Sequence, residues 1–138
     1  MYINQYELTK GLYLVKKPAE KFWGFVDHYA VMDVGNTSGL FSDVGQKPIV
    51  IEKMEGKGNV FGYLSGEWTI LGKVRDHQVF YATLRLIQAL HDPTYNLFGN
   101  NCEQFARFIA EGRKTSEQVN SLGAFALFFG AVLLLSQD

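Results

Sequence analysis

The stretch DHQVFYATLRLIQAL, residues 76–90, marks the point at which the periodicity of the sequence changes. Its apolar residues recur every three or four positions, which is the spacing of a broad buried face on an α-helix. Asp76 is a suitable N-cap, and Asp92-Pro93 ends the pattern because proline cannot continue a helix. We therefore expect a helix over residues 76–90 that is capped by Asp76.

The chain before this helix is patterned as strands. Short runs rich in β-branched and aromatic residues end at turn residues, and they cover 11–15, 25–34 and 48–54. Weaker strand patterns cover 60–64 and 68–74. Strands followed by helices favour a segregated α+β domain over alternating βαβ units.

The overall composition excludes several classes of protein. The chain has 138 residues, which fits one domain, and its 13 Lys+Arg against 14 Asp+Glu give no basic excess for nucleic acid. A single cysteine rules out an intrachain disulfide and fits a reducing compartment. The N-terminus lacks the pattern of a secretory signal, so we expect a cytoplasmic protein. Three scattered histidines and one cysteine do not form a ligand set, so no metal or organic cofactor is expected.

A second helix is predicted to open at Asn100 or Asn101, with Cys102 in its first turn. With Asn100 as the N-cap, Glu103 takes the third helical position and completes a capping box, and Gly112 ends the helix. The free N–H groups and partial positive charge of a helix start favour the thiolate and can bind an oxyanion. A lone cysteine is usually a small packing residue. Packing, however, does not require this position, so Cys102 is a candidate nucleophile.

A thiolate nucleophile needs a base that is close in space rather than in sequence. His77 and His91 lie at the ends of the helix at 76–90, where an exposed histidine is ordinary. His28 lies within an apolar strand instead, between aromatic neighbours. It is a candidate base, although a histidine in such a place can also be a half-buried core residue.

Two motifs give these residues a family context. Residues 101–105, NCEQF, resemble the Asn-Cys-Glu-His-Phe box of lecithin–retinol acyltransferase-like proteins, which include the HRAS-like suppressor phospholipase/acyltransferases. Residues 28–35, HYAVMDVG, resemble the strand motif of that family. The resemblance covers about residues 10–135. It implies a circularly permuted papain-like (NlpC-type) fold, an antiparallel sheet packed on helices, with Cys102 as nucleophile at a helix N-terminus and His28 as base.

The sequence departs from the family pattern at two positions. Gln104 replaces the histidine of the cysteine box, and it points away from Cys102 on a helix. The family's third polar residue, commonly histidine, is missing from the strand at 48–54, where Glu52 is the best substitute because a carboxylate can orient an imidazole. Glu52 can equally be the exposed end of that strand, and a one-residue slip would turn it to the other face. By resemblance, Tyr95 lies beside the active site on the oxyanion side.

The C-terminal region is the most apolar part of the chain. Residues 122–135 carry no polar side chain, and as a helix they span about 21 Å, against about 30 Å for a bilayer core. Such a segment is a membrane anchor or a packed core helix. Arg113 and Lys114 precede it, and the resembled family carries its anchor here. We therefore expect a catalytic domain over 1–118 and an apolar helix over 119–138, associated with the membrane through 119–135.

The resemblance implies cysteine-dependent acyl transfer or hydrolysis on ester lipids, through a Cys102 thioester. Two alternatives use the same fold. One is an NlpC-type peptidase or amidase acting on cell-wall peptides, which the missing secretory signal disfavours. The other is a non-catalytic, membrane-associated module, which only the departure at the third polar residue supports.

Overall fold

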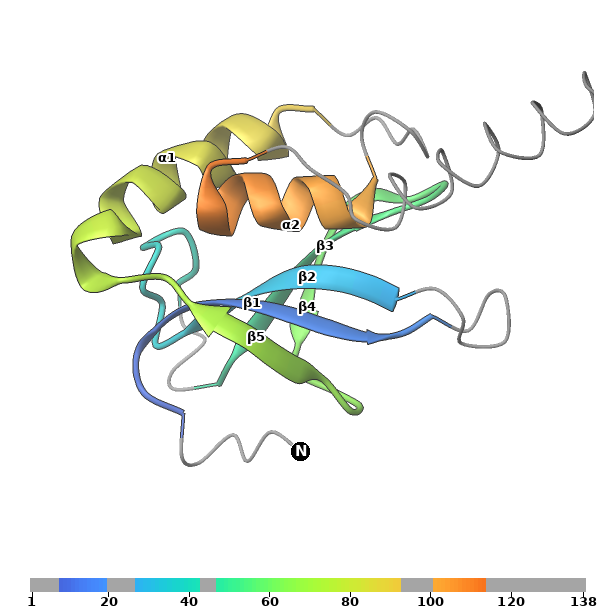
Figure 1. Ribbon diagram of the computed structural model, residues 1–138, viewed down its shortest axis with the longest axis horizontal. Coiled ribbons are helices and arrows are strands. Elements are labelled where there is room, and N and C mark those ends of the chain that lie inside the picture. Colours follow the sequence, from blue (N-terminus) through green and yellow to red (C-terminus); the bar gives the residue numbers. More distant parts are fainter. Residues whose placement is uncertain (1–7, 20–26, 43–46, 93–100, 114–138) are drawn as a thin grey trace, which may run out of the picture.

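The computed structural model describes residues 8–19, 27–42, 47–92 and 101–113. The described part forms one antiparallel sheet with the strand order β4-β3-β2-β1-β5, and two α-helices (Figure 1). The strands are β1 (Gly11–Pro18), β2 (Asp27–Val34), β3 (Ile49–Met54), β4 (Gly58–Tyr63) and β5 (Thr69–Lys73). The helices are α1 (Val79–Leu90) and α2 (Cys102–Glu111). The expectation of an α+β fold, with strands first and helices after, is confirmed.

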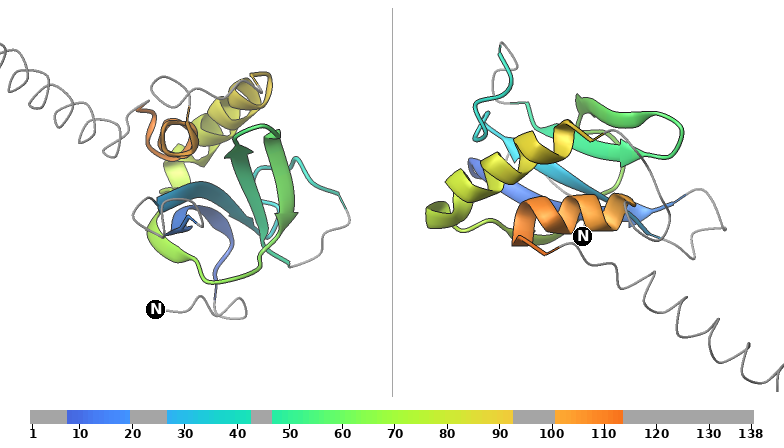
Figure 2. Two further views of the ribbon diagram at one scale, coloured as in Figure 1. Left: turned by 90° about the vertical axis from the view of Figure 1, so that its right-hand side faces the viewer. Right: turned by 90° about the horizontal axis from the view of Figure 1, so that it is seen from above.

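The helices lie side by side over one face of a strongly curled sheet, and the chain from β4 to β5 crosses the opposite, concave side (Figure 2). The alternation of side chains along the strands divides the apolar residues between these two faces. The core under the helices contains Leu14, Tyr29, Val31, Ile49, Ile51, Leu86, Phe105, Ala106 and Ile109. The core inside the curl contains Tyr13, Val15, Ala30, Met32, Val34, Val50 and Trp68.

The first strand is longer than its apolar run predicts. The pattern at 11–15 stops at two lysines, but β1 continues to Pro18 because Lys16 and Lys17 keep pairing with β2. The Lys16 ammonium lies 3.1 Å from a carboxylate oxygen of Asp27. This extension places Lys17 directly opposite His28.

The start of the first helix differs from the prediction. Asp76 is not an N-cap: it begins a 3₁₀ turn, Asp76–Gln78, and α1 follows at Val79. Arg75 takes the cap position with an extended backbone, and its carbonyl accepts the Gln78 N–H at 2.8 Å. The tighter turn closes the chain without help from a side chain, so the predicted Asp76 cap is wrong.

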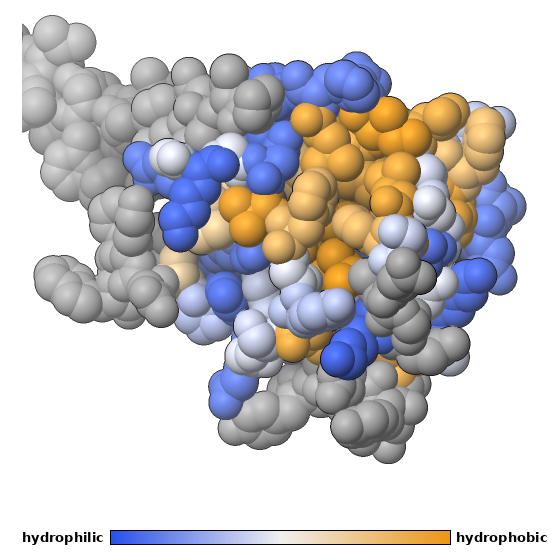
Figure 3. Space-filling view, turned by 180° about the vertical axis from the view of Figure 1, so that it is seen from behind, coloured by the Kyte–Doolittle hydropathy of each residue, from blue (hydrophilic) through white to orange (hydrophobic). Residues whose placement is uncertain are grey.

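One face of α1 is buried and the other carries exposed apolar side chains. Ala82 and Leu86 are buried, whereas Phe80, Tyr81, Leu84 and Ile87 are exposed. Figure 3 shows an apolar patch on the back of the molecule, where α1 lies. Within the described ranges, no helix is long and apolar enough to cross a membrane. The predicted apolar helix over 119–138 and its boundary at 118 lie outside the described residues.

Candidate active site

The start of α2 is fixed by a capping box at Asn101, the second of the two helix starts that the sequence offers. Asn101 is the N-cap, and its Oδ1 accepts the Gln104 N–H at 2.9 Å. The side-chain Oε1 of Gln104 accepts the Asn101 N–H at 3.0 Å in return. The predicted cap at Asn100 with Glu103 as its partner is therefore wrong, because Gln104 occupies the third helical position. Cys102 becomes the first residue of the helix.

A pair of charged side chains on α2 contacts strand β2. Glu103 is fully buried, and a carboxylate oxygen accepts from Arg107 Nε at 2.8 Å. The Arg107 guanidinium lies 5.4 Å from the ring centroid of Tyr29, which follows His28 in β2. A buried carboxylate is tolerated only when paired in this way. The pair holds α2 against β2, so that Cys102 reaches His28 at the start of that strand.

Glu52 lies beside His28 on the concave face of the sheet. Continuing the β2–β3 register, in which Val31 pairs with Ile51, places Glu52 opposite Ala30 and diagonal to His28. His28 Nε2 and Glu52 Oε1 are 2.8 Å apart, and the two side chains are only 15% and 16% exposed. Glu52 is thus not an exposed strand end, and the strand has not slipped by one residue.

The surroundings of His28 favour its protonated form. Burial alone would lower the pKa of the imidazole, but hydrogen bonds to Cys102 and Glu52, together with the charges of both groups, raise it from 6.5 to about 9. Because Nε2 meets Glu52, Nδ1 is the ring nitrogen left for the Cys102 thiol. At neutral pH the ring is therefore suited to hold a proton taken from the thiol.

The remaining feature of the site is a backbone donor. Asn101 engages the Gln104 amide, whereas the Cys102 N–H has no acceptor in the described part of the chain. Cys102 itself is 8% exposed. The N–H and the thiol of Cys102 thus lie at a buried helix start, where a developing negative charge is favoured.

The structure thus brings three of the four predicted site residues together: Cys102, His28 and Glu52. Tyr95 lies outside the described residues, so its place on the oxyanion side stays a prediction. Sequence reasoning missed Trp68, whose ring centroid lies 5.8 Å from that of His28. Its contact joins residues 40 positions apart on the concave face, and no local pattern signals it.

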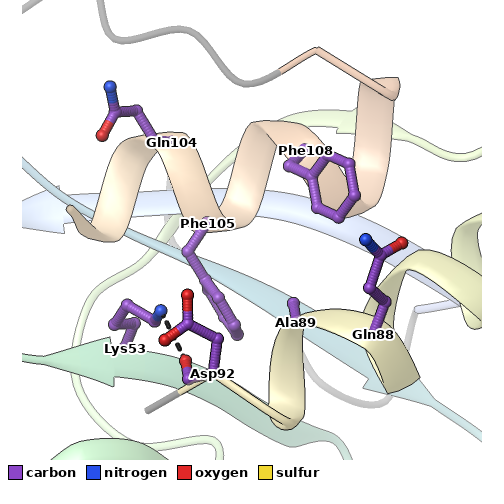
Figure 4. A pocket seen from close by; sticks show the side chains of 7 residues that line it. All are labelled: Lys53, Gln88, Ala89, Asp92, Gln104, Phe105 and Phe108. Carbon is purple, nitrogen blue, oxygen red and sulfur yellow. Dashed lines mark hydrogen bonds between the residues drawn. The ribbon is translucent and has the colours of Figure 1, made fainter. Parts of the chain in front are cut away.

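A cavity of about 210 Å³ lies between the two helices, beside this site rather than in it. Figure 4 shows its lining: Lys53, Gln88, Ala89, Asp92, Gln104, Phe105 and Phe108. The buried Lys53 donates to the backbone oxygen of Asp92 at 2.7 Å and lies 5.5 Å from the Phe105 ring. This lysine connects the end of α1 to β3. It follows Glu52 in the sequence, and its side chain lies on the opposite face of the sheet.

Comparison with known proteins identifies no relative of this chain. The chain matches no protein-family model, no curated protein and no solved structure. The assignment of the site therefore rests on the residues and their arrangement.

Proposed function

We propose that the protein is a cysteine-dependent acyl-transfer enzyme of the lecithin–retinol acyltransferase-like kind, with a circularly permuted papain-like fold. The observation that carries the proposal is the contact chain from Cys102 through His28 to Glu52. In it, a thiol at a helix start meets an imidazole whose pKa is about 9, and that imidazole meets a carboxylate at 2.8 Å. Nucleophile, base and orienting carboxylate are the three roles that such chemistry requires.

The proposed reaction has two steps. His28 holds the proton of Cys102 while the thiolate sulfur attacks the carbonyl carbon of an ester. The N–H of Cys102 stabilises the oxyanion, the ester C–O bond breaks, and His28 gives its proton to the departing alkoxide. Water, an amine or an alcohol then attacks the thioester, His28 takes the proton of that nucleophile, and the Cys102 thiol is restored.

An ester lipid is the substrate class that fits best. The outer face of α1 exposes Phe80, Leu84 and Ile87, and a contiguous apolar surface is typical of a lipid or protein interface. Residues 122–135 add a second apolar segment with Arg113 and Lys114 before it. Both features suit an enzyme whose substrate lies in a bilayer, and we propose a cytoplasmic, membrane-associated location.

Release of fatty acid from phospholipid vesicles tests this function. Cys102 is the only cysteine, so one equivalent of iodoacetamide should abolish the release. Cys102→Ser should also be nearly inactive, because a hydroxyl is much harder to deprotonate with the same base. A cell-wall peptide offered in parallel separates the peptidase alternative. Cleavage of the peptide without release of fatty acid from the vesicles would contradict the lipid assignment.

A further inference from the structure

The buried indole of Trp68 lies against the imidazole of His28. The ring centroids are 5.8 Å apart and the planes meet at 51°. Trp68 is 3% exposed, and its Nε1–H donates to the Ser65 carbonyl at 2.9 Å. This hydrogen bond and the packing of the concave core hold the indole in place independently of His28. The imidazole therefore packs against a ring whose position is already fixed.

The same indole contacts a second cationic side chain. Lys17 is the cross-strand partner of His28, and its Nζ lies 4.6 Å from the centroid of the Trp68 ring. Like charges directly opposite each other on neighbouring strands destabilise a sheet. In the described part of the chain no carboxylate pairs with Lys17, whereas Lys16 pairs with Asp27 at 3.1 Å. One buried ring thus lies within contact distance of two adjacent cationic groups.

We propose that Trp68 is a positioning residue for His28, whose indole holds the imidazole plane so that Nε2 meets Glu52 and Nδ1 meets Cys102. The indole also favours the imidazolium through a cation–π contact, and it draws the Lys17 ammonium onto its own ring. The inference rests on the proposed function only where it gives His28 the role of base. The contact itself exists without substrate.

The other groups around His28 do not replace the contact that the indole makes with the imidazole ring. Cys102 from α2 and Glu52 from β3 engage the ring nitrogens, and Lys17 from β1 is the remaining charged neighbour. Hydrogen bonds at the nitrogens engage the edge of the ring, and the indole adds a contact with the ring itself, at 5.8 Å between centroids. A cation–π contact of this kind corresponds to about 0.4–1.5 pH units in the titration of an imidazole.

The test is a ¹⁵N NMR titration of the His28 ring in the substrate-free full chain. Trp68→Leu should lower the midpoint by about 0.4–1.5 pH units and mix the ring tautomers, whereas Trp68→Phe should lower it less. Lys17→Met should change the midpoint little alone. In the Trp68→Leu background it should recover part of the loss, because the ammonium then faces the imidazole. Thermal melts would show that each variant is folded.

Fluorinated tryptophan gives a second measurement that keeps the shape of the side chain. In a Trp23→Phe background Trp68 is the only tryptophan, and each added fluorine weakens the negative face of the ring. The His28 midpoint should fall stepwise with fluorine number. A constant midpoint across this series and in the folded Trp68 variants would overturn the proposal. Absence of acyl transfer by the wild type, with the predicted shifts of the His28 midpoint in the Trp68 series, would instead refute the proposed function alone.

Discussion

Replacing Glu52 with glutamine tests what maintains the His28 imidazolium. Glutamine keeps the size of the side chain and an Oε1 acceptor for Nε2–H, so the variant removes the charge and little else. The native oxygen lies 2.8 Å from Nε2 in a site where both side chains are largely buried. An opposite charge at such a distance shifts a pKa by about 1–3 units. The pKa of His28 should therefore fall from about 9 to between about 6 and 8.

The pH dependence of kcat/KM for an ester substrate measures this change. Above the pKa of His28 the ring no longer carries the proton that the leaving alkoxide needs, so activity declines. The alkaline limb should lie near pH 9 in the wild type and about 1–3 pH units lower in Glu52→Gln. Glu55→Gln, an exposed carboxylate three residues further along, is the matched control. Equal alkaline limbs in the wild type and Glu52→Gln would refute the assignment of Glu52.

Three other perturbations test the same account. Because the folded pKa of His28 exceeds its unfolded value of 6.5, its stabilisation is complete below pH 6.5 and is lost as the pH rises through about 9. In urea melts, the stability difference between wild type and His28→Gln should shrink by about 3 kcal/mol from pH 6 to pH 10, and a constant difference would contradict the raised pKa. Asn101→Ala should lower the unfolding free energy by about 1 kcal/mol and slow alkylation of Cys102, while Asn101→Ser, which can still cap, should do neither; equal effects would exclude the capping role. Truncation after Asn120 should leave the melting temperature unchanged and slow turnover only on vesicles, whereas melting or aggregation would make the tail part of the core.

Periodicity predicts the elements of this fold better than it predicts their ends. The helix at 76–90 and the strands at 48–54 and 25–34 appear because apolar spacing reflects which side of an element is buried. The ends depend on single hydrogen bonds. Two adjacent asparagines precede Cys102 and both are acceptable caps, so only the bond from the Gln104 N–H to Asn101 decides between them.

The candidate site is predictable as a set of residue types but not as a geometry. The helix start at Cys102 and the histidine within a strand are visible locally. The carboxylate is different, because its face depends on the β2–β3 register, and a shift of one residue would turn Glu52 away from His28. Trp68 precedes β5 at the far side of the sheet order, and its contact with His28 arises only when the sheet curls.

The role of Gln104 is not apparent from the resemblance of residues 101–105 to the cysteine box. In the resembled motif it replaces a histidine, and on a helix it points away from Cys102. The structure gives it a separate task, because its side chain closes the capping box on the Asn101 N–H. A glutamine at the third helical position is a recognised capping partner. The glutamine at this position therefore stabilises the helix start at which Cys102 lies.

Intact-protein mass spectrometry after brief exposure to vesicles of mixed phospholipids tests the central claim most directly. The protein is quenched in acid, and its mass is compared with that of Cys102→Ala and His28→Ala. We predict that the wild type gains the mass of one fatty acyl group less one hydrogen. Peptide mapping should place this group on Cys102, and hydroxylamine should release it. His28→Ala should gain it much more slowly, and Cys102→Ala not at all. Fatty-acid release by the wild type without any acyl adduct on Cys102, or an equal adduct in Cys102→Ala, would contradict the thioester mechanism.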